Sequence, residues 1–179
     1  MLGSREGDAG CGGLVDLSKT IVDIVTSVRS PDELTEFFRE QGLRVTPQRQ
    51  CIFRLLEGND RHPTAEWVYQ QARSEMPTIS LKTVYQTLND LAAMGEIQTL
   101  DLGTGSARFD PNVGHHHHLV CDRCGRTQDV HVDASGLRLP RHERGDFVVG
   151  SAEIVFRGLC SSCSRNQTES AREENDRRA

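Results

Sequence analysis

The chain has 179 residues, of which 26% are charged and 36% hydrophobic, and its formal net charge is -5. This composition is typical of one or two small globular domains, and the acidic balance argues against a protein that coats nucleic acid non-specifically. No apolar run reaches the roughly 18 residues of a membrane span, and the N-terminus lacks the pattern of a signal peptide. We therefore expect no membrane association and a reducing, cytoplasmic location.

Residues 1–29 form a predicted N-terminal extension. Residues 1–13 are rich in glycine and poor in apolar side chains, which favours disorder. Residues 14–28 carry an apolar stripe at helical spacing, although their β-branched side chains weaken the helix propensity. The extension is therefore predicted to be partly disordered, with or without one helix.

Four helix starts follow between residues 30 and 95. A capping Ser or Thr marks each one, and a neighbouring proline accompanies the first three, in Ser30-Pro31, Thr46-Pro47, His62-Pro63-Thr64 and Ser80. Two extended stretches, Ile97–Leu102 and Ala107–Phe109, flank a Gly-Thr-Gly turn and predict a β-hairpin. Helices followed by a hairpin predict a winged helix-turn-helix domain over residues 30–110, whose last helix enters the DNA major groove.

The outer face of this last helix carries polar side chains suited to DNA. Lysine and threonine can bond phosphates, while glutamine and asparagine can bond adenine edges. The alternative is an ordinary solvated helix face, and residues 39–110 show no basic patch. The residues that we expect to contact DNA are Arg49, Ser80, Lys82, Thr83, Tyr85, Gln86 and Asn89.

The second half of the chain predicts a small α/β domain. Residues 111–114 have the composition of a hinge. Strands are predicted at His116–Val120, Thr127–Val132, Val148–Val149 and Ile154–Arg157, and a helix at 134–143 is interrupted by glycine and proline. This domain spans residues 115–163, and residues 164–179 form a polar tail predicted to be disordered. The fold class of the whole chain is therefore α+β.

Two Cys-x-x-Cys pairs lie in this second domain, Cys121 with Cys124 and Cys160 with Cys163. In a reducing compartment such pairs favour metal over disulfide, and four thiolates suit a tetrahedral Zn²⁺ site. Four cysteines leave no open coordination position, so the zinc is expected to be structural. A reversible disulfide switch is the alternative, but neither pair precedes a predicted helix as a thioredoxin-like motif would.

A run of four histidines, 115–118, directly precedes the first cysteine pair. On a strand, His116 and His118 share one face and His115 and His117 the other. Asp110 and Asp129 supply nearby carboxylates, and histidine with carboxylate suits Fe²⁺, Mn²⁺ or Zn²⁺. A solvated run that binds metal adventitiously is the alternative.

Six stretches together resemble the ferric uptake regulator (Fur) family of metal-dependent repressors. They are LRVTPQR (43–49), HPTAEWVY (62–69), SLKTVYQTL (80–88), ARFD (107–110), HHHHLVCDRCG (115–125) and GLCSSC (158–163). The resemblance implies a winged-helix domain hinged to a dimerisation domain, and a homodimer that binds double-stranded DNA at a palindromic operator. It also implies structural Zn²⁺ on the four cysteines and regulatory Fe²⁺ or Mn²⁺ on His62, Asp110, His116, His118 and Asp129.

Asp129 further resembles the peroxide-sensing branch, because iron-sensing members usually carry glutamate there. In that branch bound Fe²⁺ reacts with hydrogen peroxide and a histidine ligand is oxidised, and His62 and His116 match those positions. We therefore expect a peroxide-sensing repressor and no enzyme. A regulator of iron or zinc status is the alternative within the family, and a zinc-stabilised metalloenzyme the alternative outside it. A third metal site is doubtful, because Ala152 stands where iron-sensing members have histidine.

Overall fold

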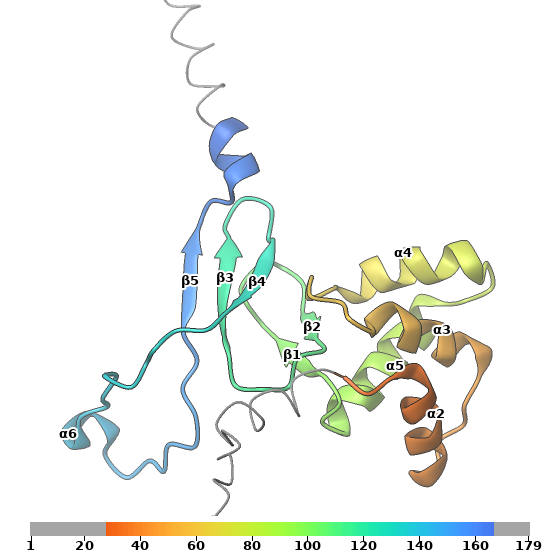
Figure 1. Ribbon diagram of the computed structural model, residues 1–179, viewed down its shortest axis with the longest axis horizontal. Coiled ribbons are helices and arrows are strands. Elements are labelled where there is room, and N and C mark those ends of the chain that lie inside the picture. Colours follow the sequence, from red (N-terminus) through yellow and green to blue (C-terminus); the bar gives the residue numbers. More distant parts are fainter. Residues whose placement is uncertain (1–27, 167–179) are drawn as a thin grey trace, which may run out of the picture.

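The computed structural model describes residues 28–166 (Figure 1). The helix predicted within 14–28 therefore lies outside the described residues except for Val28, as does most of the predicted tail. Residues 161–166 are helical, so the polar segment expected from residue 164 does not begin as irregular chain. None of the described helices is long and apolar enough to cross a membrane.

Four helices form the first part of the fold, and each begins at the predicted capping residue. They are α2 (Pro31–Glu40), α3 (Pro47–Leu56), α4 (Ala65–Glu75) and α5 (Leu81–Ala93). The caps are Ser30, Thr46, Thr64 and Ser80, and each hydroxyl accepts the N–H of the third residue along. Such caps satisfy backbone donors that the helix itself leaves free, and each contributes about 1 kcal/mol.

The helices enclose one apolar core. Phe38 of α2 and Phe53 of α3 are fully buried, with ring centroids 4.8 Å apart. Truncating a buried phenylalanine to alanine typically costs about 3–5 kcal/mol. Val28 also packs into this core, and its N–H donates to the carbonyl of Pro111 at 2.8 Å. The last residues of the predicted extension are therefore part of the helical body.

The predicted hairpin forms as β1 (Gln98–Leu100) and β2 (Arg108–Asp110), an antiparallel pair. Phe109 is buried in the helical core, and its N–H donates to the carbonyl of Pro63 at 2.9 Å. An isolated bridge joins Thr64 to Arg108. These contacts place the segment before α4 beside the end of β2.

A second sheet has the strand order β4-β3-β5. Its central strand β3 (His117–Cys121) is antiparallel to β4 (Thr127–Val130) and parallel to β5 (Val155–Gly158). In Figure 1 the β1–β2 hairpin lies between this sheet and the helices. Leu100 and Leu102 pack against Val120 of β3, so the two parts share a small apolar contact.

Residues 131–154 depart from the sequence prediction. The prediction of a strand at Val148–Val149 is wrong, because these residues form no strand. The helix predicted over 134–143 is present only as the short α6 (Arg141–Arg144). A strand needs a hydrogen-bonding partner, and the described sheet consists of β4, β3 and β5 alone, so residues 148–149 pair with no strand in it. Phe147 and Val148 are instead 75% and 96% exposed.

Candidate metal centres

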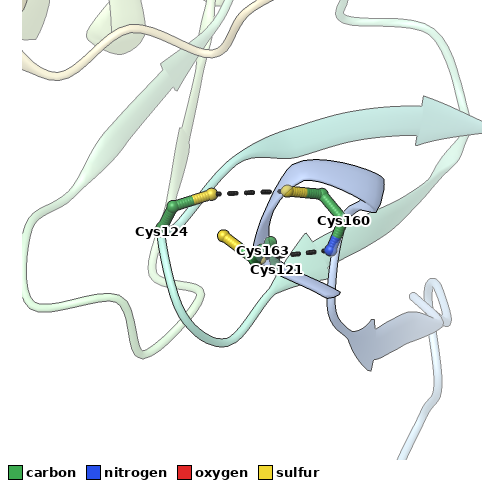
Figure 2. A group of neighbouring side chains, drawn as sticks. All are labelled: Cys121, Cys124, Cys160 and Cys163. Atoms are coloured by element: carbon green, nitrogen blue, oxygen red, sulfur yellow. Dashed lines mark hydrogen bonds between the residues drawn. The ribbon is translucent and has the colours of Figure 1, made fainter. Parts of the chain in front are cut away.

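The four paired cysteines gather at one end of the second sheet (Figure 2). Cys121 ends β3, Cys124 lies in the turn to β4, and the other pair follows β5. All four are free thiols whose sulfurs lie within 4.8 Å of one another, and the Sγ atoms of Cys124 and Cys160 are 3.8 Å apart. A tetrahedral zinc with bonds of about 2.3 Å needs sulfurs about 3.8 Å apart, so these donors fit Zn²⁺.

Backbone amides favour thiolates in this cluster. The N–H of Cys160 donates to Sγ of Cys121 at 3.3 Å, and this bond, with the N–H of Cys124, lowers the pKa of Cys121 to about 6. The N–H of Cys163 likewise lowers the pKa of Cys160. The neighbouring Cys160 side chain raises the pKa of Cys163 to about 12. Four thiolates can therefore coexist here only around a cation.

The second cluster consists of the five histidines and aspartates predicted as regulatory ligands, His62, Asp110, His116, His118 and Asp129. One ligand atom of each lies within 4.8 Å of the others. Nε2 of His62 is 2.6 Å from Oδ1 of Asp129, and Nε2 of His116 is 2.9 Å from Oδ2 of Asp110. Asp129 is the most exposed, at 26% of its side chain, while the other four are at most 2% exposed.

The facing atoms of this cluster fit a divalent cation. Nε2 of His62, Oδ2 of Asp110 and Oδ1 of Asp129 are buried without a hydrogen-bond partner. Nε2 atoms of His116 and His118 are 2.9 Å apart. Carboxylates and unprotonated imidazole nitrogens only accept hydrogen bonds, so such atoms repel unless a proton or cation lies among them. Three imidazoles and two carboxylates suit Fe²⁺, Mn²⁺ or Zn²⁺.

The charges of the cluster favour a positive centre. Burial alone would lower the pKa of His62, but the close carboxylates of Asp110 and Asp129 outweigh it and raise that pKa. For Asp110, burial acts to raise the pKa, but His62 and the N–H of Asn112 lower it. The site therefore stabilises one positive charge between two carboxylates.

Residues 40–144 match the sequence model of the ferric uptake regulator family. The chain belongs to that family. The resemblance drawn from the six motifs is confirmed, and so is the α+β fold, with an N-terminal winged-helix DNA-binding domain and a C-terminal dimerisation domain.

Individual relatives agree with this family assignment. The peroxide-responsive repressor PerR of Staphylococcus aureus is 34% identical over 144 residues, which cover 79% of this chain and 97% of PerR. A solved zinc-bound manganese uptake regulator is 26% identical, with a TM-score of 0.58, over 74% of this chain and 99% of its own. The ferric uptake regulator from Francisella tularensis, solved with iron, is 25% identical and has a TM-score of 0.58. The match covers 69% of this chain and 96% of that regulator.

Asn112 orients the carboxylates of both Asp110 and Asp129, although the sequence indicated only that it lies in a hinge. Its backbone N–H donates to Oδ1 of Asp110 at 2.8 Å, and its side-chain N–H donates to Oδ2 of Asp129 at 2.7 Å. The remaining oxygen of each carboxylate is thereby turned toward the histidines. The turn signal Pro111-Asn112 was the one feature of the sequence that could have indicated this role.

Arg108 fixes the backbone at His62. Its Nη1 donates to the carbonyl of His62 at 2.9 Å, and His62 has φ 48, in the left-handed region that few residues with a side chain adopt. The other end of the guanidinium, Nη2, lies so close to Gly125 that a Cβ at that position would be only 3.0 Å away. Gly125 directly follows Cys124 of the first cysteine pair. Arg108 therefore spans the space between the two clusters.

The remaining histidines of the run point away from the second cluster. The rings of His115 and His117 lie 5.2 Å apart, and the predicted alternation of the four side chains is confirmed. His117 is buried, and its Nδ1 accepts the N–H of Ile154 at 3.2 Å. Neither residue belongs to a metal-binding group within residues 28–166.

The predicted DNA-contacting residues differ in their availability. On α5, Lys82, Tyr85, Gln86 and Asn89 are exposed, whereas Ser80 caps the helix and Thr83 is half-buried. The hydroxyl of Tyr85 donates to Glu66 at 2.6 Å. Arg49 forms an ion pair with Asp90 at 2.5 Å, and its side chain is only 12% exposed.

One cleft of about 830 Å³ reaches the second cluster. Asp129 lies in its wall together with Asp60, Arg61, Arg126, Thr127 and Gln128. Asp129 is also the most exposed member of the cluster, so the cleft and the cluster share this one residue.

Proposed function

We propose that this chain is a dimeric, metal-dependent transcriptional repressor that senses peroxide. The observation that carries this proposal is the composition of the second cluster. His62 comes from the helical domain, Asp110 from the end of the hairpin, and the other three from the sheet side. A single ion bonded to all five fixes the angle between helices and sheet, so metal binding biases a hinge.

We assign the parts of the chain accordingly. Residues 30–110 bind DNA, residues 111–114 are the hinge, and residues 115–163 form the dimerisation domain, with an extension at 1–29 and a tail at 164–179. Structural Zn²⁺ is held by the four paired cysteines, and Fe²⁺ or Mn²⁺ by the second cluster. Because chromosomal DNA is the proposed partner, we infer a cytoplasmic location.

A dimer explains the exposed apolar side chains of the dimerisation domain. Leu137, Leu139, Phe147 and Val148 are 56–96% exposed in one protomer, and such groups favour contact with a partner. A two-fold dimer presents α5 twice at a fixed spacing, which suits a palindromic operator. Binding is reciprocal, so operator DNA tightens the regulatory metal by the same factor as the metal tightens DNA.

Peroxide is the proposed signal for two reasons. Asp129 resembles the peroxide-sensing branch of the family, and PerR of Staphylococcus aureus is a 34% identical relative. Bound Fe²⁺ would activate hydrogen peroxide, so that one peroxide oxygen is added to an imidazole, which gives up two electrons, and the other oxygen leaves as water; Mn²⁺ would leave the site inert. The imidazoles of His62 and His116 lie at this site and would take up oxygen. An oxidised His62 no longer donates well, so the hinge is released.

Two alternatives make different predictions. A regulator of iron or zinc status would bind DNA according to metal supply and would show no oxidation. A zinc-stabilised metalloenzyme would use the second cluster for catalysis. We favour the repressor over the enzyme because all five polar side chains of the cluster converge on one point, which leaves none of them to act on a substrate.

Mass spectrometry of the iron-loaded protein tests the sensing step. Protein that already contains zinc is loaded with either Fe²⁺ or Mn²⁺, exposed briefly to hydrogen peroxide and then digested with a protease. We expect one added oxygen atom on the peptide containing His62 or His116, together with loss of DNA binding, in the Fe²⁺ form alone. DNA binding that follows Fe²⁺ without any oxygen uptake would support iron sensing instead.

A further inference from the structure

Glu153 contacts the second cluster from outside. Its Oε1 lies 2.8 Å from Nδ1 of His118. The other nitrogen of that ring, Nε2, faces the cluster, 2.9 Å from Nε2 of His116 and 3.5 Å from Oδ2 of Asp110. The His118 side chain is 2% exposed, whereas that of Glu153 is 48% exposed. Glu153 therefore touches the nitrogen that is turned away from the donor atoms.

The chemistry of the two groups fixes which ring nitrogen of His118 faces the cluster without a hydrogen. A carboxylate accepts hydrogen bonds and donates none, so Nδ1 of His118 must carry the hydrogen. In the neutral imidazole Nε2 then presents its lone pair to the cluster. A charged acceptor on the outer nitrogen also makes the ligating nitrogen a better donor.

The other two histidines are held differently. Nδ1 of His116 contacts the carbonyl of Gly114 at 2.7 Å, and Nδ1 of His62 has no hydrogen-bond partner in the described structure. Among residues 28–166, Glu153 is thus the carboxylate that orients a histidine of this cluster through its outer nitrogen. Glu153 precedes β5, so this contact also ties that segment to β3.

We propose that Glu153 is a positioning residue of the regulatory site, which sets its affinity for a divalent cation by holding the ring and the tautomer of His118. This inference rests on the proposed function, since it requires the second cluster to bind a metal ion. Glu153 itself does not ligate, because its carboxylate and the cluster lie on opposite edges of the imidazole. Loss of such an outer hydrogen bond typically weakens metal binding by about 10–100-fold.

The test titrates the zinc-loaded full chain with Mn²⁺, and records the visible spectrum after loading with Co²⁺. We expect Glu153→Ala to weaken Mn²⁺ binding by about 10–100-fold and to shift the Co²⁺ absorption bands. Glu153→Gln keeps an oxygen that accepts from Nδ1 of His118. Its Mn²⁺ affinity should therefore lie between those of wild type and Glu153→Ala, and its Co²⁺ spectrum should stay close to that of wild type. Bound zinc reports the fold of every variant.

Glu143→Ala provides the matched control, because Glu143 forms a largely exposed pair with His142 at 3.4 Å. It should bind Mn²⁺ like wild type. The inference is overturned if Glu153→Ala keeps wild-type affinity and spectrum, or if Glu153→Gln loses as much as Glu153→Ala. A wild-type protein that binds no Mn²⁺ beyond its zinc overturns the proposed function itself, and the inference with it.

Discussion

Nε2 of His62 lies 2.6 Å from Oδ1 of Asp129, although His62 precedes α4 and Asp129 lies in β4. The contact joins the helical domain to the sheet at a buried point, where neither of these two atoms has a hydrogen-bond partner. A cation at this point bonds both domains at once. In the proposed function, metal binding at this point would also hold the two domains together, and would thereby control the DNA-binding helix.

Asn112→Ala tests the orientation of the carboxylates. The substitution removes the N–H that holds Oδ2 of Asp129 at 2.7 Å, while the backbone N–H to Asp110 remains. Mn²⁺ affinity should fall by about 10–100-fold with zinc content unchanged, as measured by calorimetric titration. Asn89→Ala, on the exposed face of α5, should leave that affinity intact. Equal affinity in both variants would show that Asn112 has no such role.

Cys121→Ser tests the structural zinc. A serine hydroxyl does not ionise as the Cys121 thiol does, whose pKa is lowered to about 6, so the fourth anionic ligand is lost. We expect less than one bound zinc per chain, a lower melting temperature and loss of the dimer. Cys51→Ala removes a buried cysteine of the helical core and should keep its zinc. Full zinc content and an intact dimer in Cys121→Ser would refute the assignment.

Lys82→Ala tests the DNA-facing side of α5. Lys82 is exposed, and a lysine that contacts a phosphate contributes similarly on every sequence. Its removal should weaken DNA binding and reduce the slope of log affinity against log salt by about 1, measured by fluorescence anisotropy. Arg141→Ala, which changes an exposed residue of α6, should leave the slope unchanged. The same slope in both variants would show that Lys82 does not contact a DNA phosphate.

The metal-free protein should lose stability as pH rises. The folded pKa of His62 is raised above 6.5, so its contribution is complete below that value and disappears as pH rises through the folded pKa. The folded pKa of Asp110 is lowered below 3.8, so its contribution is lost only in stronger acid. With Mn²⁺ bound the trend reverses, because protons compete with the metal for His62.

Thermal unfolding of zinc-loaded protein with and without Mn²⁺, from about pH 5 to about pH 8, measures this difference. His62→Gln keeps a polar side chain that does not titrate, and should flatten both trends. A metal-free wild-type protein with the same pH dependence as His62→Gln would show that His62 does not contribute.

Local signals explain which parts of the fold could be predicted. The starts of α2 to α5 depend on a capping side chain and residues within one turn, so Ser30 and Thr46 could be assigned from the sequence. The prediction of a strand at Val148–Val149 was wrong because strand formation depends on pairing with a distant segment, which no local pattern encodes.

The candidate site shows the same division. The proposed ligand residues were predicted from their spacing and, for His62, from the resemblance to the Fur family, and the structure brings them together in two clusters. The outer contacts were not, because Asn112 and Glu153 meet Asp129 and His118 only in the folded chain. Arg49 was predicted to contact DNA, but its ion pair with Asp90, on another helix, was not visible in the sequence.

The most direct test of the account is whether DNA binding requires the regulatory metal through His62. Duplex DNA is selected from a random pool by the zinc- and Mn²⁺-loaded dimer, and its binding is then measured with and without Mn²⁺ for wild type and His62→Ala. The account predicts a palindromic consensus, tight binding by wild type only with Mn²⁺, and weak binding by His62→Ala in both conditions with zinc and dimer intact. Equal DNA affinity with and without Mn²⁺, or wild-type affinity in His62→Ala, would contradict it.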